Sequence, residues 1–183
     1  PYAICRAGIG RTFQNIRLFK DLTVLDNVVI ALQQNRPYPL VASFLRVPPF
    51  ARSEADIRAE SLELLRLMGL DSKAGEIARN LPYGDQRHLE IARALATQPT
   101  LLLLDEPAAG MNPAETAQLS GLISRLRDEF KLTILLIEHD MSLVMKICER
   151  IYVLDHGVVI AQGTPVEVRA NPKVIEAYLG EEA

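Results

Sequence analysis

The sequence predicts an α/β fold in which a mainly parallel sheet is flanked by helices and carries an inserted helical segment. From residue 85 onward, helical periodicity alternates with short apolar runs, the pattern of a parallel sheet built of right-handed crossovers. Residues 21–80 carry only helical patterns and turn residues. The run 101–104 is four leucines bounded by turn residues, which predicts a strand buried on both faces.

Composition and charge describe an ordinary globular chain of 183 residues, 49% hydrophobic and 23% charged, with a net charge of −3. This balance gives no support to a polyanion-binding surface such as that of a nucleic-acid-binding protein. Cys5 and Cys148 lack metal-ligand spacing, and we expect free thiols in a reducing compartment. The sequence shows no signal peptide and no apolar run near the roughly 20 residues of a membrane span, so we expect a cytoplasmic location.

The first half of the chain predicts one short strand followed by helices. Thr23 is the expected cap of the first helix, and Ser53 that of the second. Between them, four prolines predict an irregular connector whose apolar residues suit a partner surface. The expected elements are a strand over 10–14, a helix over 24–34, the connector over 36–50, a helix over 53–68 and a short helix over 74–79.

The second half predicts alternating helices and strands, then a hairpin and two short helices. Asp155-His156-Gly157 is the expected hairpin turn. The predicted helices are 85–97, 113–129, 141–148, 165–169 and 172–179, and the predicted strands are 100–104, 132–137, 150–155 and 158–161.

Polar residues follow two of the apolar strands at their carboxyl ends. Asp105 and Glu106 end the first run, and Glu138-His139-Asp140 follow the second. Open α/β sheets bind ligands at this edge, so the pattern suits a nucleotide enzyme in which one acid holds Mg²⁺ and the next polarises a water. The alternative is a buried strand that merely exits into a polar loop.

These motifs, in this order, resemble the ATP-binding subunit of an ABC transporter, whose ATPase core is of the P-loop NTPase type. The resemblance covers the chain from end to end. The matching segments are Gln14 in the glutamine loop; Leu81-Pro82-Tyr83-Gly84-Asp85 with Gln86 and Arg87 in the signature; Leu101 to Glu106 in the Walker B strand; Ala108-Ala109-Gly110-Met111-Asn112 in the D-loop; and His139 as the switch histidine.

The resemblance implies ATP and Mg²⁺ as cofactors and a role for each motif. Asp105 would hold Mg²⁺, and Gln14 would bind Mg²⁺ or the attacking water. Glu106 would orient or deprotonate that water, and His139 would sense the γ-phosphate. Pro82, Tyr83, Gly84, Asp85 and Gln86 would meet the nucleotide of a second subunit. His88 and His156 are expected at the surface or in turns, and Arg87 and Arg93 are expected to be solvated or ion-paired.

Within the family, the segments 11–19, 83–87, 137–141 and 163–180 are similar to importers of branched-chain amino acids. The implied partners are a second ATPase subunit (the same or a different chain), two transmembrane permease subunits and, indirectly, a periplasmic or extracellular binding protein, with no nucleic acid. The implied location is the cytoplasmic face of the plasma (inner) membrane. The implied division is a core remnant 1–20, a helical subdomain 21–84, a core 85–162 and a C-terminal extension 163–183.

The sequence departs from the family pattern in two ways. It contains no Gly-x-x-x-x-Gly-Lys-Ser/Thr phosphate loop, and Gly8 to Thr12 mimics one only superficially, so we expect that the N-terminal part is missing. Pro82, Tyr83 and Asn112 stand where the family usually has Ser, Gly and Asp, which we interpret as tuned activity.

Three alternatives stay open at this point. The first is the ATPase of a urea or amide importer or of a lipopolysaccharide exporter. The second is a DNA-repair or chromosome-maintenance ATPase, which would normally carry a coiled-coil insertion longer than residues 21–80. The third is a non-catalytic interaction module.

Overall fold

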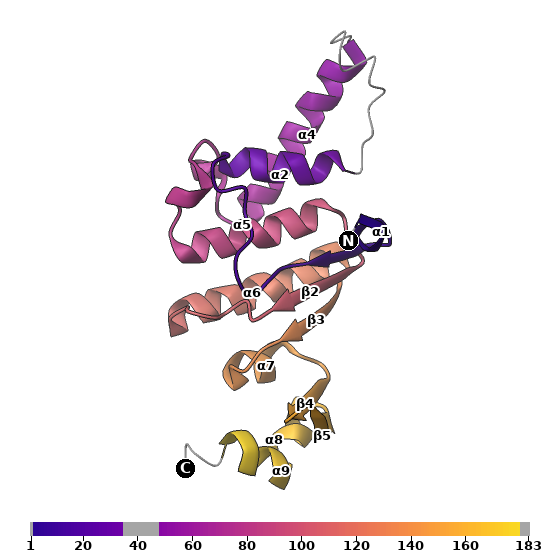
Figure 1. Cartoon of the computed structure of the whole chain (residues 1–183), viewed down its shortest axis with the longest axis vertical. Helices are drawn as coiled ribbons and strands as arrows, with labels where there is room; N and C mark the ends of the chain where they lie inside the picture. Colours follow the sequence, from indigo (N-terminus) through magenta and orange to yellow (C-terminus); the bar gives the residue numbers. More distant parts are fainter. Residues whose placement is uncertain (1, 35–47, 180–183) are drawn as a thin grey trace.

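The structure is a computed structural model that describes residues 2–34 and 48–179. Three parallel strands form its main sheet in the order β1 (Ile9–Arg11), β2 (Leu101–Asp105) and β3 (Thr133–Ile137). Helices α2 (Val24–Gln33) and α4 (Pro48–Leu67) lie at one end of the molecule in Figure 1, and α5 (Tyr83–Ala96) lies between them and the sheet. The predicted α/β class with an inserted helical part is confirmed.

The remaining described elements follow the predicted order, apart from an N-terminal helix that was not predicted. They are α1 (Tyr2–Arg6), the 3₁₀ turns η1 (Asp71–Lys73) and η2 (Ala78–Asn80), α6 (Pro113–Phe130), α7 (Met141–Ile147), β4 (Ile151–Asp155), β5 (Val158–Gly163), α8 (Pro165–Arg169), α9 (Pro172–Val174) and the π-helical turn η3 (Ile175–Leu179). Strand β1 ends at Arg11, so the predicted strand over 10–14 is wrong for residues 12–14.

Helix α4 begins five residues before the predicted cap at Ser53. It starts at Pro48, and proline is tolerated in the first helical turn because its missing N–H would have no partner there. The predicted connector is therefore wrong for residues 48–50. Its other residues, 36–47, lie outside the described part of the chain.

The short helix predicted over 74–79 does not form. The carbonyls of Ala74 and Glu76 instead accept the first amides of α2, from Leu25 at 3.0 Å and from Val24 at 2.9 Å. These amides have no partner inside their own helix, and the turn between η1 and η2, where Ile77 forms a bridge to Thr23, supplies the carbonyls that satisfy them. Tertiary pairing outweighs local helical preference here.

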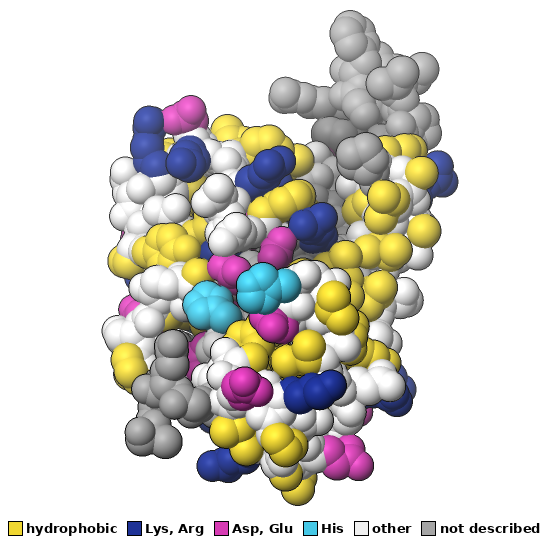
Figure 2. Space-filling view, turned by 60° about the horizontal axis from the view of Figure 1, so that its bottom comes forward, with side chains coloured by type: hydrophobic (Ala, Val, Ile, Leu, Met, Phe, Trp, Pro, Cys, Tyr) yellow, Lys and Arg dark blue, Asp and Glu magenta, His cyan; other side chains and the backbone are white. Residues whose placement is uncertain are grey.

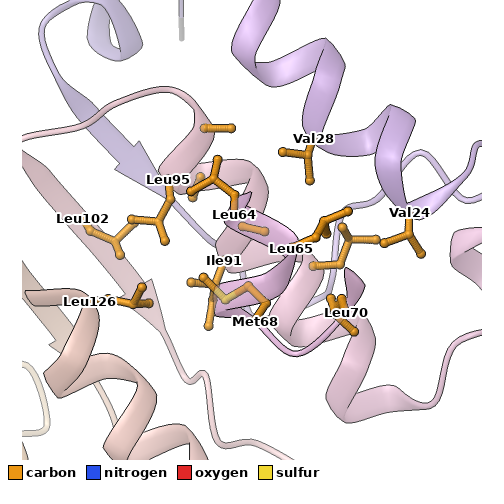
Figure 3. Close-up of a cluster of buried hydrophobic side chains, with 14 of the residues drawn as sticks. Val24, Val28, Leu64, Leu65, Met68, Leu70, Ile91, Leu95, Leu102 and Leu126 are labelled. Carbon is orange, nitrogen blue, oxygen red and sulfur yellow. The ribbon is translucent and has the colours of Figure 1, made fainter. Parts of the chain in front are cut away.

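One continuous core joins the helical part to the sheet. Figure 3 shows Val28 of α2, Leu64 of α4, Leu95 of α5 and Leu102 of β2 pointing into the same cluster. Three side chains of α6 belong to the same cluster: Leu119, Ile123 and Leu126. The core explains why α5, which leads directly into β2, is buried along most of its length.

The prediction that β2 is buried on both faces is wrong. Leu102 and Leu104 are each 1% exposed, whereas Leu101 and Leu103 are only half-buried. On the neighbouring strand, Leu135 is 56% exposed and pairs in register with Leu103. Helices of the described residues cover one face of the sheet only, so the alternate side chains form an apolar face open to solvent.

The strand predicted over 150–155 does not extend the parallel sheet. Within the described ranges β4 pairs antiparallel with β5 in a separate two-stranded sheet. This hairpin shares a small second core with α7, α8 and α9, whose members are Val144, Ile151, Val153, Ala161, Val168 and Val174. The predicted turn at Asp155-His156-Gly157 is confirmed, with positive φ at His156 (46°) and Gly157 (79°).

The two faces of the sheet should respond differently to the same truncation. Leu104→Ala should lower the free energy of unfolding by about 2–5 kcal/mol, because it leaves a cavity in the core. Leu135→Ala, on the adjacent strand, should change it by no more than about 0.5 kcal/mol. Urea denaturation of both variants measures the difference, and equal losses would show that the Leu135 face is covered in solution.

Folding stability should also fall as the pH drops below about 6.5, because of His88. Burial lowers the pKa of this half-buried imidazole, so the unfolded chain binds a proton there that the folded chain resists. Stability is then lost as pH falls through the unfolded pKa. Melting curves measured between about pH 7.5 and 5 bracket the ordinary pKa of histidine. Over this range the melting temperature of His88→Gln should change less with pH than that of the wild type. His156→Gln, whose side chain is 94% exposed, is the matched control and should keep the wild-type slope.

Candidate active site

The predicted site begins where β2 ends. Glu106 follows the strand with φ of 43°, a backbone conformation that non-glycine residues rarely adopt, and its N–H donates to the Ile137 carbonyl at 2.9 Å. The strand ladder therefore continues one residue beyond β2 while the chain turns sharply. Such left-handed residues are enriched at functional sites, where the surrounding structure compensates for the strain.

Gln14, Glu106 and His139 come together at this edge, as the sequence predicts. The Gln14 side-chain amide donates from Nε2 to Glu106 Oε2 at 2.8 Å. His139 Nδ1 lies 3.9 Å from Glu106 Oε1, beyond hydrogen-bonding distance, and its side chain is 70% exposed. The carboxylate of Glu106 thus lies between a neutral amide and an imidazole that is free to approach other groups.

Asp105 has a neighbour that the sequence did not suggest. Arg11, at the end of β1, donates from Nη2 to Asp105 Oδ2 at 3.0 Å, and both side chains are partly exposed. The segment Gly8 to Thr12 contains strand β1, which excludes it as a phosphate loop. The Arg11–Asp105 contact joins residues 94 apart in sequence, so neither local pattern nor periodicity could have found it.

Carboxylate and amide oxygens are the donors that Mg²⁺ prefers, and Mg²⁺ commonly binds one or two protein groups together with phosphates and waters. Asp105 with one oxygen on Arg11, and Gln14 with its amide nitrogen on Glu106, fit that donor set. The residues that the structure describes contain no group of three or more His, Cys, Asp or Glu side chains that could hold a metal ion.

A second carboxylate, Glu138, organises the loops around Glu106. Its Oε1 accepts from the Ala108 amide at 2.8 Å, and its Oε2 accepts from the amides of His139 at 3.1 Å and Asp140 at 3.4 Å. Glu138 thereby ties the loop that follows β2 to the loop that follows β3. The sequence pattern predicts Glu138 only as one of the polar residues that follow β3. A glutamate beside two polar loop residues can accept hydrogen bonds from their amides, and this is the local signal that could have identified its role.

The D-loop residues Ala109, Gly110, Met111 and Asn112 lead from Glu106 into α6. Gly110 has φ of 76°, which glycine adopts without strain. Asn112 caps α6: its Oδ1 accepts the amides of Ala114 and Glu115, each at 3.0 Å, while Glu115 accepts the Asn112 amide at 2.9 Å. The asparagine therefore performs the capping that an aspartate would perform at this position.

The signature segment opens α5 beside this loop. Pro82 is the N-cap residue, and Gln86 donates from its side chain to the Leu81 carbonyl at 2.8 Å. Asp85 forms an ion pair with Lys73 of η1, which raises the pKa of the lysine ammonium. Tyr83 is 46% exposed, and its ring lies against Gly110 of the D-loop. The ring is so close that a Cβ atom, if Gly110 had one, would lie 3.6 Å from the Tyr83 Cε1 atom.

Two helices hold the segment that carries Gln14, a feature that sequence analysis missed. Arg87 and Glu90 of α5 bind the backbone of residues 13–17, and Arg93 of α5 donates to the Arg17 carbonyl. At the far end, buried Asn27 of α2 exchanges two hydrogen bonds with the backbone of Phe19, at 2.9 and 3.0 Å. Arg87 is ion-paired, as one expectation had it, but it is buried rather than solvated.

Figure 2 shows acidic side chains grouped around two histidines on one face, with hydrophobic side chains over much of the same view. The exposed hydrophobic residues include Leu135 and Ile137 of β3. Across residues 2–34 and 48–179, no helix has the length and apolar character needed to cross a membrane.

Two family models match the sequence. The model described as ABC transporter matches residues 2–109, and the one described as branched-chain amino acid ATP-binding cassette transporter matches residues 158–183. The high-affinity branched-chain amino acid transport ATP-binding protein LivG of Salmonella typhimurium is 51% identical over 178 residues, covering 97% of this chain and 70% of the relative. The corresponding protein BraF of Pseudomonas aeruginosa is 47% identical over 180 residues, covering 98% of this chain and 71% of the relative.

Solved structures agree with the sequence matches. An ATP-binding cassette of an ABC transporter in its ADP conformation superposes with a TM-score of 0.77 at 28% identity, over 98% of this chain and 71% of that one. A dimeric cassette in a post-hydrolysis state, bound to ADP and Pi, superposes with a TM-score of 0.69 at 26% identity, over 86% of this chain and 62% of that one. The chain belongs to the ABC transporter family, among its branched-chain amino acid ATP-binding cassette proteins.

Proposed function

We propose that this chain belongs to the subunit that hydrolyses ATP to drive the import of branched-chain amino acids. The observation that carries the proposal is the placement of Glu106, at the end of a parallel strand, between Gln14 and His139. The names of relatives about half identical to this chain supply the transported class. Transport chemistry itself would lie in other subunits, which this chain energises.

Glu106 is the group that would act on the attacking water. Its carboxylate would accept a hydrogen bond from the water and take up the proton as the new bond to the γ-phosphorus forms and the bond from that phosphorus to the leaving oxygen of ADP breaks. Positioning and electrostatics dominate phosphoryl transfer, so holding the water in line matters more than the basicity of Glu106. Gln14 fixes one carboxylate oxygen at 2.8 Å, which orients the other oxygen.

His139 would complete the site from the neighbouring strand. Its 3.9 Å separation from Glu106 leaves the imidazole able to turn toward a phosphate oxygen. Catalytic hydrogen bonds are often long before the substrate is bound and tighten in the complex. His139 would thus sense the γ-phosphate and keep the water aligned with Glu106.

Asp105 and Gln14 are the residues that would hold Mg²⁺, whose chemistry here is to neutralise charge on the phosphate oxygens. Arg11 supports this role because its contact with Oδ2 fixes the orientation of the Asp105 carboxylate. An alternative use of Arg11 is as a direct phosphate contact, which its partly exposed side chain permits.

Assembly would complete the site in a dimer. Pro82, Tyr83, Gly84, Asp85 and Gln86 would face the nucleotide bound to a second ATPase subunit, and the dimeric ADP-and-Pi cassette with the same fold supports this arrangement. Two permease subunits would hold the dimer at the cytoplasmic face of the membrane. Residues 21–84 would serve as the helical subdomain that contacts them, with residues 163–183 as a C-terminal extension.

The 183-residue chain alone should bind Mg-ATP weakly, with a dissociation constant above about 1 mM. The sequence contains no Gly-x-x-x-x-Gly-Lys-Ser/Thr loop, whose backbone amides and lysine supply most of the hold on the phosphates. Isothermal titration calorimetry measures the affinity. Micromolar binding would mean that other residues of this chain form a phosphate site.

Glu106→Gln should slow turnover by orders of magnitude but keep nucleotide binding, when tested in this chain extended to the length of its curated relatives. The amide keeps the shape and the contact with Gln14 but cannot accept the proton, so kcat should fall by about 100- to 10,000-fold. Steady-state ATPase assays and nucleotide-binding titrations separate the two effects. Glu149→Gln, an exposed glutamate paired with Arg127, is the control and should match wild type; wild-type turnover by Glu106→Gln would refute the assignment of the catalytic acid.

A further inference from the structure

Arg87 and Glu90 form a buried ion pair on the α5 face that meets the Gln14 segment. Their side chains are 0% and 5% exposed, and Arg87 Nη1 lies 2.7 Å from Glu90 Oε2. Removing two charges from water costs several kcal/mol per ion, and well-packed apolar residues often stabilise a fold equally well. Arg87 Nε has no hydrogen-bond partner among the described residues, which adds to the cost. Stability alone is a poor explanation for this pair.

The pair grips the backbone on both sides of Gln14. Arg87 donates from Nη1 to the Phe13 carbonyl at 2.6 Å and from Nη2 to the Gln14 carbonyl at 2.9 Å. Glu90 Oε1 accepts the amides of Phe13 at 3.3 Å and Arg17 at 3.1 Å. Two side chains thus make four hydrogen bonds to one short loop, in a fixed fork geometry that a lysine or a neutral residue would not reproduce.

Arg87 also reaches the start of its own helix. Its Nη2 donates to the Tyr83 hydroxyl at 3.2 Å. The Tyr83 ring lies against Gly110, in the loop that follows Glu106. Gln14 in turn donates to Glu106 at 2.8 Å. Contacts therefore run in a closed circuit from Glu106 through Gln14, Arg87 and Tyr83 back to the loop of Glu106.

We propose that Arg87, oriented by Glu90, is a positioning residue that sets the Gln14 side chain against Glu106 and couples it to the start of α5. This inference rests on the proposed ATPase function. A shift of the Tyr83 end of α5 moves Arg87, and with it the Gln14 backbone, relative to the catalytic acid. The signature segment and the water-orienting glutamine of one subunit are then mechanically linked within that subunit.

A double-mutant cycle tests the proposal in the chain extended to the length of its relatives. Arg87→Lys should lower kcat for ATP about 10- to 100-fold while KM changes by less than about threefold, because the loop is misplaced and not removed. In a Gln14→Ala background, Arg87→Lys should have no further effect on kcat, since both changes disable the same contact. Arg79→Lys, an exposed arginine paired with Asp21, is the matched control and should match wild type.

The same variants give a readout that needs no activity. In the 183-residue chain, Arg87→Lys should accelerate amide hydrogen exchange at Phe13 and Arg17 more than at the β2 amides, since those two amides donate to the pair. Uniform acceleration across the core would indicate a structural role only and overturn the proposal.

The remaining outcomes are also decisive. Additive losses in Arg87→Lys and Gln14→Ala would overturn the positioning role. If Arg87→Lys does not fold, Tyr83→Phe replaces it in the cycle; it removes only the hydroxyl bonded to Arg87, and its smaller kcat loss should likewise vanish in the Gln14→Ala background. If the wild-type chain, extended to the length of its relatives, hydrolyses no ATP, the proposed function is instead refuted.

Discussion

The in-register parallel pairing of β2 with β3 is the constraint on which the rest of the site depends. It aligns Asp105 with Ile137, so the residues that follow the two strands emerge at one edge of the sheet. The bond from the Glu106 amide to the Ile137 carbonyl extends this pairing into the turn. A shift of β3 by one residue would exchange its two faces and remove His139 from Glu106. The core beneath, from Leu102 and Leu104 to α5 and α6, fixes that register because only one set of leucines fits against the helices.

The open face of the sheet follows from the same alternation. With Leu102 and Leu104 in the core, the side chains of Leu103, Leu135 and Ile137 must point the other way. Both faces are apolar in sequence, which is typical of parallel strands covered by helices on two sides. The sequence pattern therefore predicts more burial of these strands than the described residues provide. Exposed leucines on an edge strand favour association with another apolar surface.

The features predicted from the sequence are those with a local pattern of residues. The features that could not be predicted are contacts between residues far apart along the chain. Apolar runs with polar tips located β2, β3, Glu106 and His139, and the edge rule for parallel sheets brought them together. The Arg11–Asp105 contact spans 94 residues and has no local signature. The pair Arg87–Glu90 does have a local signature, opposite charges three residues apart on a helix, but its further partners are backbone atoms of residues 13–17. Nearly every residue carries the same backbone carbonyl and amide groups, so the sequence does not show which of them a charged pair binds. That Arg87 and Glu90 hold a loop can be seen only in the structure.

Different charged groups position the loops of the site and act as its proton acceptor, and this separation keeps the Glu106 carboxylate able to accept a proton. Glu138, Glu90 and Arg87 each form hydrogen bonds to backbone groups, and these bonds fix the loops that carry His139 and Gln14. Among the described residues, the Glu106 carboxylate has the neutral Gln14 amide within hydrogen-bonding distance, and the His139 imidazole lies farther away at 3.9 Å. A carboxylate locked to an arginine would be a poorer proton acceptor, because the cation favours its charged form. Arg87 binds the Gln14 carbonyl and does not contact Glu106 directly. It therefore positions the hydrogen-bond partner of Glu106 without placing a positive charge against the Glu106 carboxylate.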